Sequence, residues 1–535
     1  MQKTAAGFLR EATGLVRTFS WRDMFIFNLY GTNWGVVLAA STLTGALVFP
    51  GANMAIAVTV ALALLIFNAL GTAWMAVIMP RSGGDYIWNT YTLRHSIGFI
   101  FTWGMFLNAA FAIGIYSALT INYGASATLA TLGTLLNNSF LASAGSAAAT
   151  ANWTFIGGTI AIWVSVPFFT LGPRLSRAFM WVIFVPCVIG VILALALLAT
   201  ATNASFVSAF NSAMHSYTNS SNSYQAVINS ATQAGGTLPA VSILASVAAL
   251  PLGFWSFVGY NNSINLAGEI KTPNKSQPLA IIASLVATWA VLAFAFQKFY
   301  DVVGWNFNSA VSYLFNVAPS HYTLPVPPTF NFFVSMLTNN PIVSGLIGIS
   351  FILWVFMLVG PMFLLSSRYI FNFSFNRVTP SVFARVNNRG SPTFAVLLMA
   401  VLGEIFLTLY VYTGALSLMN YTMVFAIVYI VDGFSMLLVY NRRRDLFSAA
   451  PGYVKKKIGA LPLIALFGAI NIVFFAFIVY FSVITPAFSG PVGPASFTVL
   501  LGIFLSGALI YAVASLLRKR EGINLGLISK EIPPE

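Results

Sequence analysis

The feature of this sequence that most limits its fold is the length of its charge-free stretches. No Asp, Glu, Lys or Arg occurs between Arg94 and Arg174, or between Arg177 and Glu269. Charged residues make up 7% of the 535 residues, whereas soluble domains average about 25%. Because a membrane-spanning helix requires roughly 20 apolar residues, the sequence predicts an all-α polytopic membrane protein.

Twelve segments of the chain are apolar and long enough to span a membrane. They lie near residues 23–49, 53–79, 97–121, 153–171, 178–201, 239–268, 278–300, 341–366, 392–413, 416–440, 459–484 and 494–517. The expected organisation is a tail (1–22), a first group of five helices (23–201), an exterior loop (202–238), a second group of five helices (239–440), a loop with two further helices (441–517) and a tail (518–535).

The positive charges predict the orientation of these helices. Cytoplasmic loops carry an excess of Lys and Arg. With a cytoplasmic N-terminus, 24 of the 25 Lys and Arg fall on the cytoplasmic side, and only Lys298 falls outside. We therefore expect a multi-pass protein of the plasma membrane with both termini in the cytoplasm. Topology and attraction to the anionic headgroups of the lipid bilayer explain the net charge of +14 without a nucleic acid partner.

Few residues offer metal, cofactor or enzyme chemistry. The single Cys187 excludes an internal disulfide and a thiolate metal cluster. His95, His215 and His321 have no partner at a spacing typical of metal ligands. The sequence contains no nucleotide-binding loop, and no nucleophile, base and orienting group can be assembled. We therefore expect no cofactor, no metal and no catalytic residue, which makes an enzyme the weakest hypothesis.

The expected exterior loop is long and rich in Asn, Ser and Thr, and it has no formally charged residue. Glycosylation sequons on the expected exterior begin at Asn137, Asn152, Asn203 and Asn219. One interpretation is a glycosylated or merely flexible loop. The alternative is a surface that faces strong acid, where a lack of both charge signs keeps the surface charge insensitive to pH.

Two of the twelve segments are longer than a membrane span and are interrupted near mid-depth. The interruptions are NLYGTNWG (28–35) in the first segment and GFWSFVGY (253–260) in the sixth. Irregular backbone at membrane depth is tolerated where it lines a cavity inside the protein. Gly31 and Gly35 also fit the G-x-x-x-G motif of close helix packing. However, Gly-interrupted segments at corresponding positions of two halves indicate the central site of a transporter.

Three further stretches carry a resemblance to a known family. They are MPRSGGDYIW (79–88), FWSFVGYNNSINLAGEIKTPNKSQPLAI (254–281) and SSRYIFNFSFNRVTPSVFARVNNRGSP (366–392). In this order and spacing, they resemble signatures of the amino acid–polyamine–organocation superfamily of secondary transporters. The resemblance runs from the first segment to about Ala395. It implies 12 transmembrane helices in a 5+5 inverted repeat (LeuT-like) plus two peripheral helices, although no internal repeat is detectable in the sequence.

The two breaks predict how a substrate is bound. Unwinding a helix frees N–H groups at the start of one half and C=O groups at the end of the other. Freed N–H groups around 33–36 can hold a carboxylate, and freed C=O groups near Leu29 and Ser256 can accept from an ammonium group. Partial charge at each helix end adds about 0.3–2 kcal/mol. This arrangement suits a zwitterionic amino acid, and the resemblance implies that Trp255 covers the bound substrate from outside.

The predicted substrate-binding residues all belong to the two interruptions. They are Leu29, Gly31, Thr32, Asn33, Trp34, Gly35, Val36, Trp255, Ser256, Phe257, Val258, Gly259, Tyr260 and Asn261.

Three departures from the family pattern narrow the substrate and the coupling ion. Asn261 stands where some proton-coupled exchangers of basic amino acids carry an acid, so we expect a neutral amino acid substrate. Pro186 stands where some relatives carry a lysine in the fifth helix. The stretch 351–365 of the eighth helix has no Ser or Thr, which argues against the sodium site of sodium-coupled relatives.

Two acids in the expected spans are candidates for proton linkage. Glu404 lies in the middle of the ninth segment, and Asp432 lies in the cytoplasmic half of the tenth. A charged group at membrane depth costs several kcal/mol unless it is paired or protonated, so it is a functional candidate by default. The alternative for each is a protonated or hydrogen-bonded acid with a structural role.

The sequence therefore predicts a permease that carries an amino acid by alternating access, with the proton as coupling ion. One alternative is a sensor that binds an amino acid without transporting it. Another is a permease of a different small organic cation or a polyamine. A channel is disfavoured because no ring of charge and no repeated pore motif occurs in the sequence.

Overall fold

The computed structural model describes residues 17–413, 421–484 and 494–527. These residues are almost entirely helical, and the only strands among them form the hairpin of β1 (Lys457–Ile458) and β2 (Leu461–Pro462). Within the described part, ten helices are long and apolar enough to cross a membrane. The expected class, an all-α polytopic membrane protein, is confirmed.

Nine of these ten spans are regular helices, and one joins three elements. The nine are α4 (Met54–Ile78), α9 (Ala151–Thr170), α10 (Pro173–Thr200), α15 (Pro273–Val303), α18 (Pro341–Phe375), α19 (Thr393–Thr413), α20 (Tyr421–Arg442), α22 (Leu463–Ile484) and α23 (Pro494–Arg520). The tenth is α6 (His95–Leu119), which continues through the π-helix η1 (Thr120–Ala125) into α7 (Ser126–Leu135).

Some helices extend well beyond the apolar stretch that predicts them. The third span continues to Leu135 and the eighth to Phe375, whereas the sequence suggests ends at 121 and 366. The added turns of α18 include Ser366, Ser367 and Arg368, which are buried against neighbouring elements. Hydropathy locates the lipid-facing part of a helix, so it misses turns that other parts of the protein cover.

The first and sixth expected spans are broken, as the sequence predicts. The first consists of α2 (Trp21–Thr32) and α3 (Trp34–Val48). The sixth begins with the short helices α13 (Ile243–Ala248) and α14 (Leu250–Trp255). It continues as turns and the 3₁₀ segments η2 (Asn262–Asn265) and η3 (Ala267–Glu269). The part of the sixth span that follows Asn261 is therefore not an α-helix.

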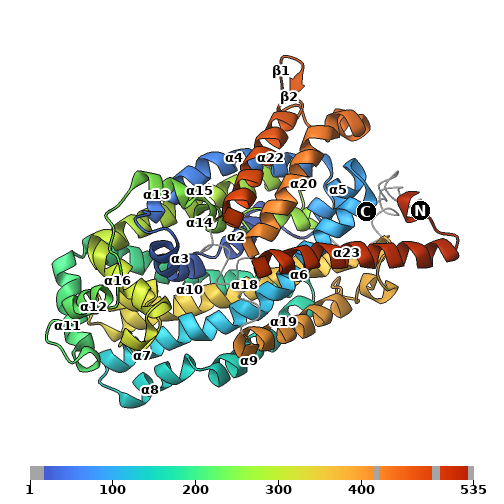
Figure 1. The fold of residues 1–535 in the computed structure, drawn as a ribbon. Helices are drawn as coiled ribbons and strands as arrows, with labels where there is room; N and C mark the ends of the chain where they lie inside the picture. Colours follow the sequence, from blue (N-terminus) through green and yellow to red (C-terminus); the bar gives the residue numbers. More distant parts are fainter. Residues whose placement is uncertain (1–16, 414–420, 485–493, 528–535) are drawn as a thin grey trace.

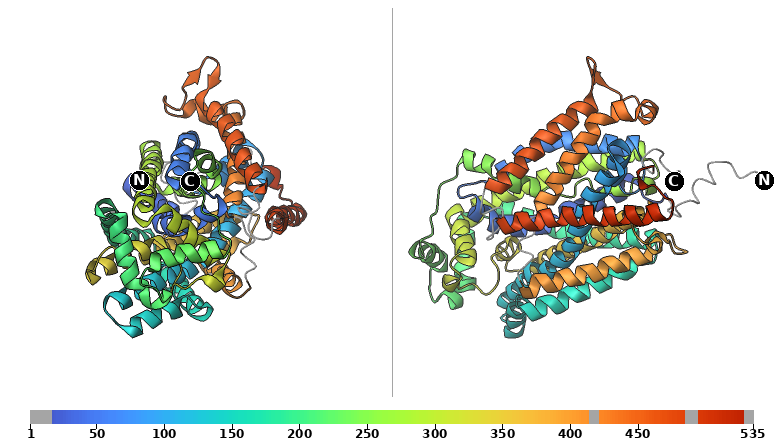
Figure 2. Two further views of the ribbon diagram at one scale, coloured as in Figure 1. Left: turned by 60° about the vertical axis from the view of Figure 1, so that its left-hand side comes forward. Right: turned by 45° about the vertical axis from the view of Figure 1, so that its right-hand side comes forward.

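The long helices lie around α18, with α22 and α23 added outside. α18 contacts α6, α10 and α19, while α15 contacts α2 and α4. α22 packs against α20 and α4, and α23 runs along α6 on the outer face in Figure 1. Figures 1 and 2 show α11 and α12 at one end of the bundle, which we call the loop side. The opposite end, with α5 and the C-terminal end of α23, is the tail side.

The segment 202–238 is helical, so its interpretation as a merely flexible loop is wrong. It forms α11 (Asn203–Thr218) and α12 (Ser223–Gln233). Phe206, Phe210 and Met214 are fully buried, and both Phe rings contact Phe307 and Phe333. A spacing of four places these apolar residues on one face of a helix, which explains why an uncharged segment packs onto the bundle.

The remaining short elements connect the spans or, in the case of η7, follow the last one. They are α5 (Asp85–Thr92), α8 (Ser139–Ala148), α16 (Trp305–Asn316), η4 (Pro319–His321), α17 (Phe330–Ser335), η5 (Ser381–Ala384), α21 (Arg444–Ala449) and η7 (Leu525–Leu527).

Candidate functional site

The break in the first span is a single residue. Asn33 has φ 44° and ψ 78°, a left-handed conformation that Asn tolerates better than most residues. Its side-chain Oδ1 accepts a hydrogen bond from the N–H of Val36 at 2.9 Å, which caps the start of α3. Its Nδ2 donates to the C=O of Trp354 on α18. The break is therefore fixed on one side by its own cap and on the other by α18.

The C=O of Leu29 is not free, contrary to the sequence-based expectation. It accepts from the N–H of Asn33 at 2.9 Å and from the hydroxyl of Thr32 at 3.1 Å. The reason is that α2 continues to Thr32, one turn beyond Leu29. The C=O groups that the end of this helix presents are instead those of 30–32.

The two breaks touch each other through glycine. A Cβ on Gly31 would lie 2.6 Å from the C=O oxygen of Gly259, and a Cβ on Gly259 would lie 2.5 Å from the carbonyl carbon of Gly31. Gly259 also has φ 99°, which only glycine adopts readily. A Cβ on Gly35 would lie 2.5 Å from Cβ of Trp354. Gly31 thus lies where the two breaks cross each other, whereas Gly35 allows α3 to pack closely against α18.

Side chains from other helices satisfy the backbone of the sixth break. The N–H of Ser263 donates to Oδ1 of Asn28 at 2.8 Å, and its C=O accepts from Nε2 of Gln277 at 2.7 Å. The hydroxyl of Ser284 donates to the C=O of Tyr260 at 2.8 Å. These bonds replace helical ones, so an α-helix is not needed here. Among the described residues, no backbone N–H donates to the C=O of Ser256.

A small cavity lies where the two breaks meet, and its volume is about 10 Å³. Six of the predicted residues line it: Gly31, Thr32, Asn33, Val36, Trp255 and Val258. Four further lining residues were not predicted: Val37, Tyr116, Leu358 and Tyr421. A volume of roughly 10–15 Å³ accommodates about one water-sized probe, so this conformation is closed around the breaks. None of the lining residues is charged.

The other predicted residues belong to the breaks but do not line the cavity. They are Leu29, Trp34, Gly35, Ser256, Phe257, Gly259, Tyr260 and Asn261. The Trp34 Nε1–H donates to the hydroxyl of Thr288 at 3.0 Å, and its ring lies 5.1 Å from the ring of Trp354. Oδ1 of Asn261 accepts from the hydroxyl of Tyr429 at 2.8 Å. Trp34 and Asn261 thus connect the breaks to neighbouring helices without lining the cavity.

Three of the four lining residues that sequence reasoning missed come from helices without a break, and Val37 lies on α3 just beyond the predicted stretch. Tyr116 lies near the end of α6, and Tyr421 begins α20. A tyrosine in an otherwise apolar span is a usable signal, because its buried hydroxyl requires a partner. Leu358 gives no such signal, since nothing distinguishes it from other apolar residues of α18.

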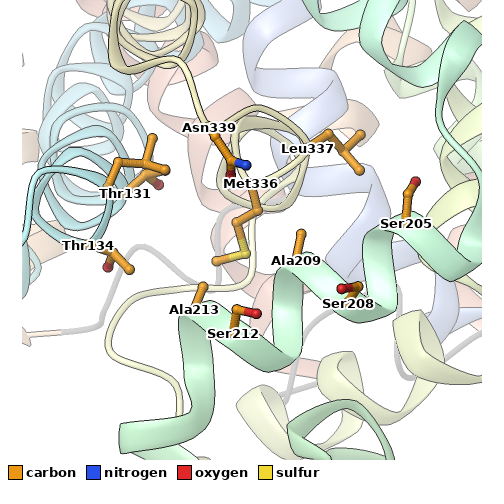
Figure 3. A pocket seen from close by; sticks show the side chains of 11 residues that line it. Thr131, Thr134, Ser205, Ser208, Ala209, Ser212, Ala213, Met336, Leu337 and Asn339 are labelled. Carbon is orange, nitrogen blue, oxygen red and sulfur yellow. The ribbon is translucent and has the colours of Figure 1, made fainter.

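A much larger cavity, of about 610 Å³, lies on the loop side (Figure 3). Its walls are α7, α11 and the segment between α17 and α18. Its lining residues are Thr131, Thr134, Leu135, Ser205, Ser208, Ala209, Ser212, Ala213, Met336, Leu337 and Asn339. It shares no lining residue with the cavity at the breaks, and none of these residues lies on a broken span. We therefore place the candidate site at the breaks despite its smaller volume.

The three signature stretches of the sequence meet on the tail side. Arg368 donates from Nε and Nη2 to the two carboxylate oxygens of Glu269 at 2.9 and 2.8 Å, and both residues are 1% exposed. Ser82 forms a β-bridge with Leu266, and Asn372 donates to the C=O of Ser82 at 3.0 Å. One buried cluster thus forms on the tail side of the sixth break. Its members are about 100 and 290 positions apart in the sequence.

Comparisons with known proteins agree with this geometry. The sequence model of a family described as "Amino acid permease" matches residues 24–519. The chain belongs to the amino acid permease family. Part of the permease is also 28% identical over 188 residues to "Glutamate/serine transporter AimA" of Bacillus subtilis (strain 168). That match covers 33% of the permease and spans about a third (31%) of the length of its relative. The resemblance to the amino acid–polyamine–organocation superfamily is confirmed.

The two acids of the permease's membrane spans have very different surroundings. Glu404 on α19 is half-buried, and its Oε1 accepts from the hydroxyl of Thr159 on α9 at 2.5 Å. This pair joins two helices that contribute nothing to the cavity. Asp432 on α20 is 1% exposed and accepts from Nδ2 of Asn89 at 2.7 Å. It lies three residues after Tyr429, which donates to Asn261 of the sixth break.

Proposed function

We propose that this permease carries a neutral, zwitterionic amino acid across the plasma membrane by alternating access around its two broken spans, linked to protons. The observation that carries the proposal is the uncharged cavity lined by both breaks. In this proposal the tail side faces the cytoplasm, because the Lys- and Arg-rich loops belong on that side.

The ends of the broken helices supply groups for both charges of the substrate. The N-terminal turn of α3 offers N–H groups at Trp34 and Gly35, since the cap of Asn33 already binds the N–H of Val36. The helix dipole adds partial positive charge at this point. The C-terminal turn of α2 and the C=O of Ser256 offer acceptors for the ammonium group. Trp255, which is half-buried at the cavity wall, covers the substrate.

The uncharged lining favours a substrate without an ionised side chain. A cationic amino acid or a polyamine requires a carboxylate, and an acidic amino acid requires a cation, because a buried unpaired charge is costly. The name of the Bacillus relative includes glutamate and serine. Of these, serine suits the cavity of this permease, since its side chain needs only hydrogen-bond partners such as the hydroxyls of Tyr116 and Tyr421.

The closed cavity and the buried tail-side cluster support alternating access. A cavity of about 10 Å³ is too small for an amino acid, so binding requires the half-helices and Trp255 to separate on one side. The Glu269–Arg368 pair is buried, so passage to the tail side requires this pair to become accessible. Opening one side while the other remains closed is the motion that transporters with broken helices use.

Counterflow in proteoliposomes tests the proposal. Vesicles loaded with unlabelled L-serine are expected to accumulate labelled L-serine transiently, and unlabelled alanine should compete while lysine and glutamate should not. The Val258→Trp variant, which adds a large ring to the cavity wall, should abolish exchange. Val473→Trp on the exposed face of α22 is the matched control and should retain exchange.

A thermal-shift measurement separates transport from sensing. A bound ligand raises the melting temperature through its mass-action term. Stabilisation by serine together with exchange supports the permease proposal. Stabilisation without exchange contradicts it and favours the amino acid sensor, whereas exchange of lysine or a polyamine overturns the neutral substrate.

A further inference from the structure

Two buried carboxyl groups lie on elements that pack against each other on the tail side, outside the substrate cavity. Asp85 begins α5 and is 2% exposed, and Asp432 on α20 is 1% exposed. α5 packs against α20, and Asn89, one turn after Asp85 on α5, donates its side-chain amide to Asp432 at 2.7 Å. The two acids come from stretches of sequence more than 340 residues apart, which is why the sequence does not reveal the pair.

The hydrogen bonds of the pair are incomplete. Oδ1 of Asp85 accepts from the hydroxyl of Tyr369 at 3.0 Å and from the N–H of Tyr86 at 3.1 Å. Oδ1 of Asp432 accepts from Asn89, but its Oδ2 is buried without a hydrogen-bond partner. Two carboxylates in one buried site cannot both ionise cheaply. This pair therefore holds at least one proton more readily than isolated acids do.

No cation in the described part of the chain forms an ion pair with either carboxyl group. The buried cation Arg368 donates to Glu269 from Nε and Nη2 and to the hydroxyl of Ser367 from Nη1. The other titratable side chains on the elements around the pair are phenols and one imidazole, together with the cation Arg442 at the end of α20, which donates to the C=O of Thr92 on α5, and with Arg81 and Arg443 beside the two elements. The phenols and the imidazole are Tyr86, Tyr91, His95, Tyr260, Tyr369 and Tyr429. Among the described residues, the pair therefore has no directly bound counter-ion, and a proton can take that role.

The pKa of Asp85 lies in the range expected of a group that takes up and releases a proton. Burial raises the pKa of Asp85 from 3.8 to about 7, while the hydrogen bonds from Tyr369 and the backbone oppose the rise. A group with a pKa near the working pH can both take up and release a proton.

We propose that Asp85 and Asp432 together form the site that holds the transported proton, an inference that rests on the proposed proton-linked function. The proton binds a carboxylate oxygen of the pair while the tail side is closed. It leaves to water, as a proton only, when the tail side opens. No other bond forms or breaks.

The pair is connected to both parts of the molecule that must move. Tyr429, one turn before Asp432 on the same face of α20, donates to Asn261 in the sixth break. Tyr369 donates to Asp85 and directly follows Arg368, which holds Glu269 at the end of that break. Loss of the proton leaves two like charges between α5 and α20, which pushes these helices apart. Substrate movement at the breaks and proton release are thereby linked.

The test compares exchange with gradient-driven uptake for Asp85→Asn and Asp432→Asn in proteoliposomes. An inward gradient of one pH unit supports about tenfold accumulation of L-serine if one proton accompanies each substrate. We expect each variant to lose this accumulation and to continue counterflow, which needs no net proton movement. Glu404→Gln, which removes a carboxyl group apart from both breaks, is the matched control and should still accumulate serine.

The outcomes separate this inference from the proposed function. If the wild-type protein accumulates serine and both variants do so equally well, the carboxyl pair is not the proton site, although proton linkage stands. If the wild-type protein exchanges serine but ignores the pH gradient, proton linkage itself fails, and the inference fails with it.

A second variant keeps the test valid if the Asn variants do not fold. Tyr369→Phe removes a hydrogen bond that lowers the pKa of Asp85, so the pH profile of gradient-driven uptake should shift to higher pH. Tyr453→Phe, at an exposed tyrosine of the tail side, should leave the profile in place. An unchanged profile for Tyr369→Phe would overturn the proposal.

Discussion

The two breaks of this permease differ in how they are built. The first is one left-handed residue, Asn33, followed at once by the regular helix α3. The second runs from Ser256 through Gly259 into 3₁₀ turns, and its backbone is satisfied by side chains of α2 and α15. The first break therefore rests on its own cap and a single bond to α18, whereas the second depends on several side chains of two other helices. We infer that the first is the fixed part of the site and the second is the part that moves.

The largest effect is expected at the inner end of the second break. Arg368→Ala leaves Glu269 as a buried, unpaired charge, which costs about 3–5 kcal/mol. The melting temperature should fall strongly, and little folded protein should be recovered. Replacing both partners with apolar residues (Glu269→Leu with Arg368→Met) should restore much of the stability but not transport. Full transport by the double variant would show that the pair is only a structural contact.

The crossing of the breaks is expected to be the next most sensitive point. Gly259→Ala places a Cβ against the backbone of Gly31 and forces a left-handed alanine, with a strain of about 1–3 kcal/mol. Serine exchange should be lost, because the two breaks can no longer approach. Gly502→Ala on α23, where nothing lies within 4 Å of the new Cβ, should behave as wild type. Normal exchange by Gly259→Ala would remove the crossing from the mechanism.

Asn28 tests whether the second break depends on the first span. Asn28→Ala removes both hydrogen bonds to Ser263, of 2.8 and 3.1 Å. It leaves a buried N–H unsatisfied, at a cost of about 1–3 kcal/mol. The exchange rate should fall by more than the change in melting temperature accounts for. The reason is that Asn28 no longer holds Ser263 of the second break in position. Asn229→Ala, at an exposed side chain of α12, is the control. Equal loss of rate and stability would indicate a purely structural role.

The sequence predicts those parts of the fold that are determined by residues within a single segment of the chain. The spans follow from hydropathy, and both breaks follow from Gly and Asn within apolar segments. The sequence does not predict that the second break continues as 3₁₀ turns, because the groups that permit it, Gln277 and Ser284, lie on another helix. The same holds for the partnership of Asp85 with Asp432. The inverted repeat remains an implication of the family resemblance.

The first break should tolerate substitution better than the second. Asn33→Gly keeps the left-handed conformation and loses the cap of Val36 and the bond to Trp354. Gly in place of an Asn cap costs only a few tenths of a kcal/mol, and one lost hydrogen bond costs about 1 kcal/mol. We expect a melting temperature close to wild type, with a raised KM for serine because the start of α3 is less well held. A loss as large as that of Gly259→Ala would contradict the distinction between a fixed and a moving break.

The smallest effect concerns pH and follows from Asp85. Its pKa is raised by burial from 3.8 to about 7 in the folded protein. Between these values the unfolded chain is ionised while the folded protein keeps the proton. The folded state thus binds more protons, and its stability falls as the pH rises from about 4 to about 7 before it levels off. Asp85→Asn should lack this part of the slope, so its melting temperature should decline less than that of the wild-type protein over the same range. Parallel curves would mean that Asp85 keeps an ordinary proton affinity, and the pair would then bind its proton at Asp432 alone.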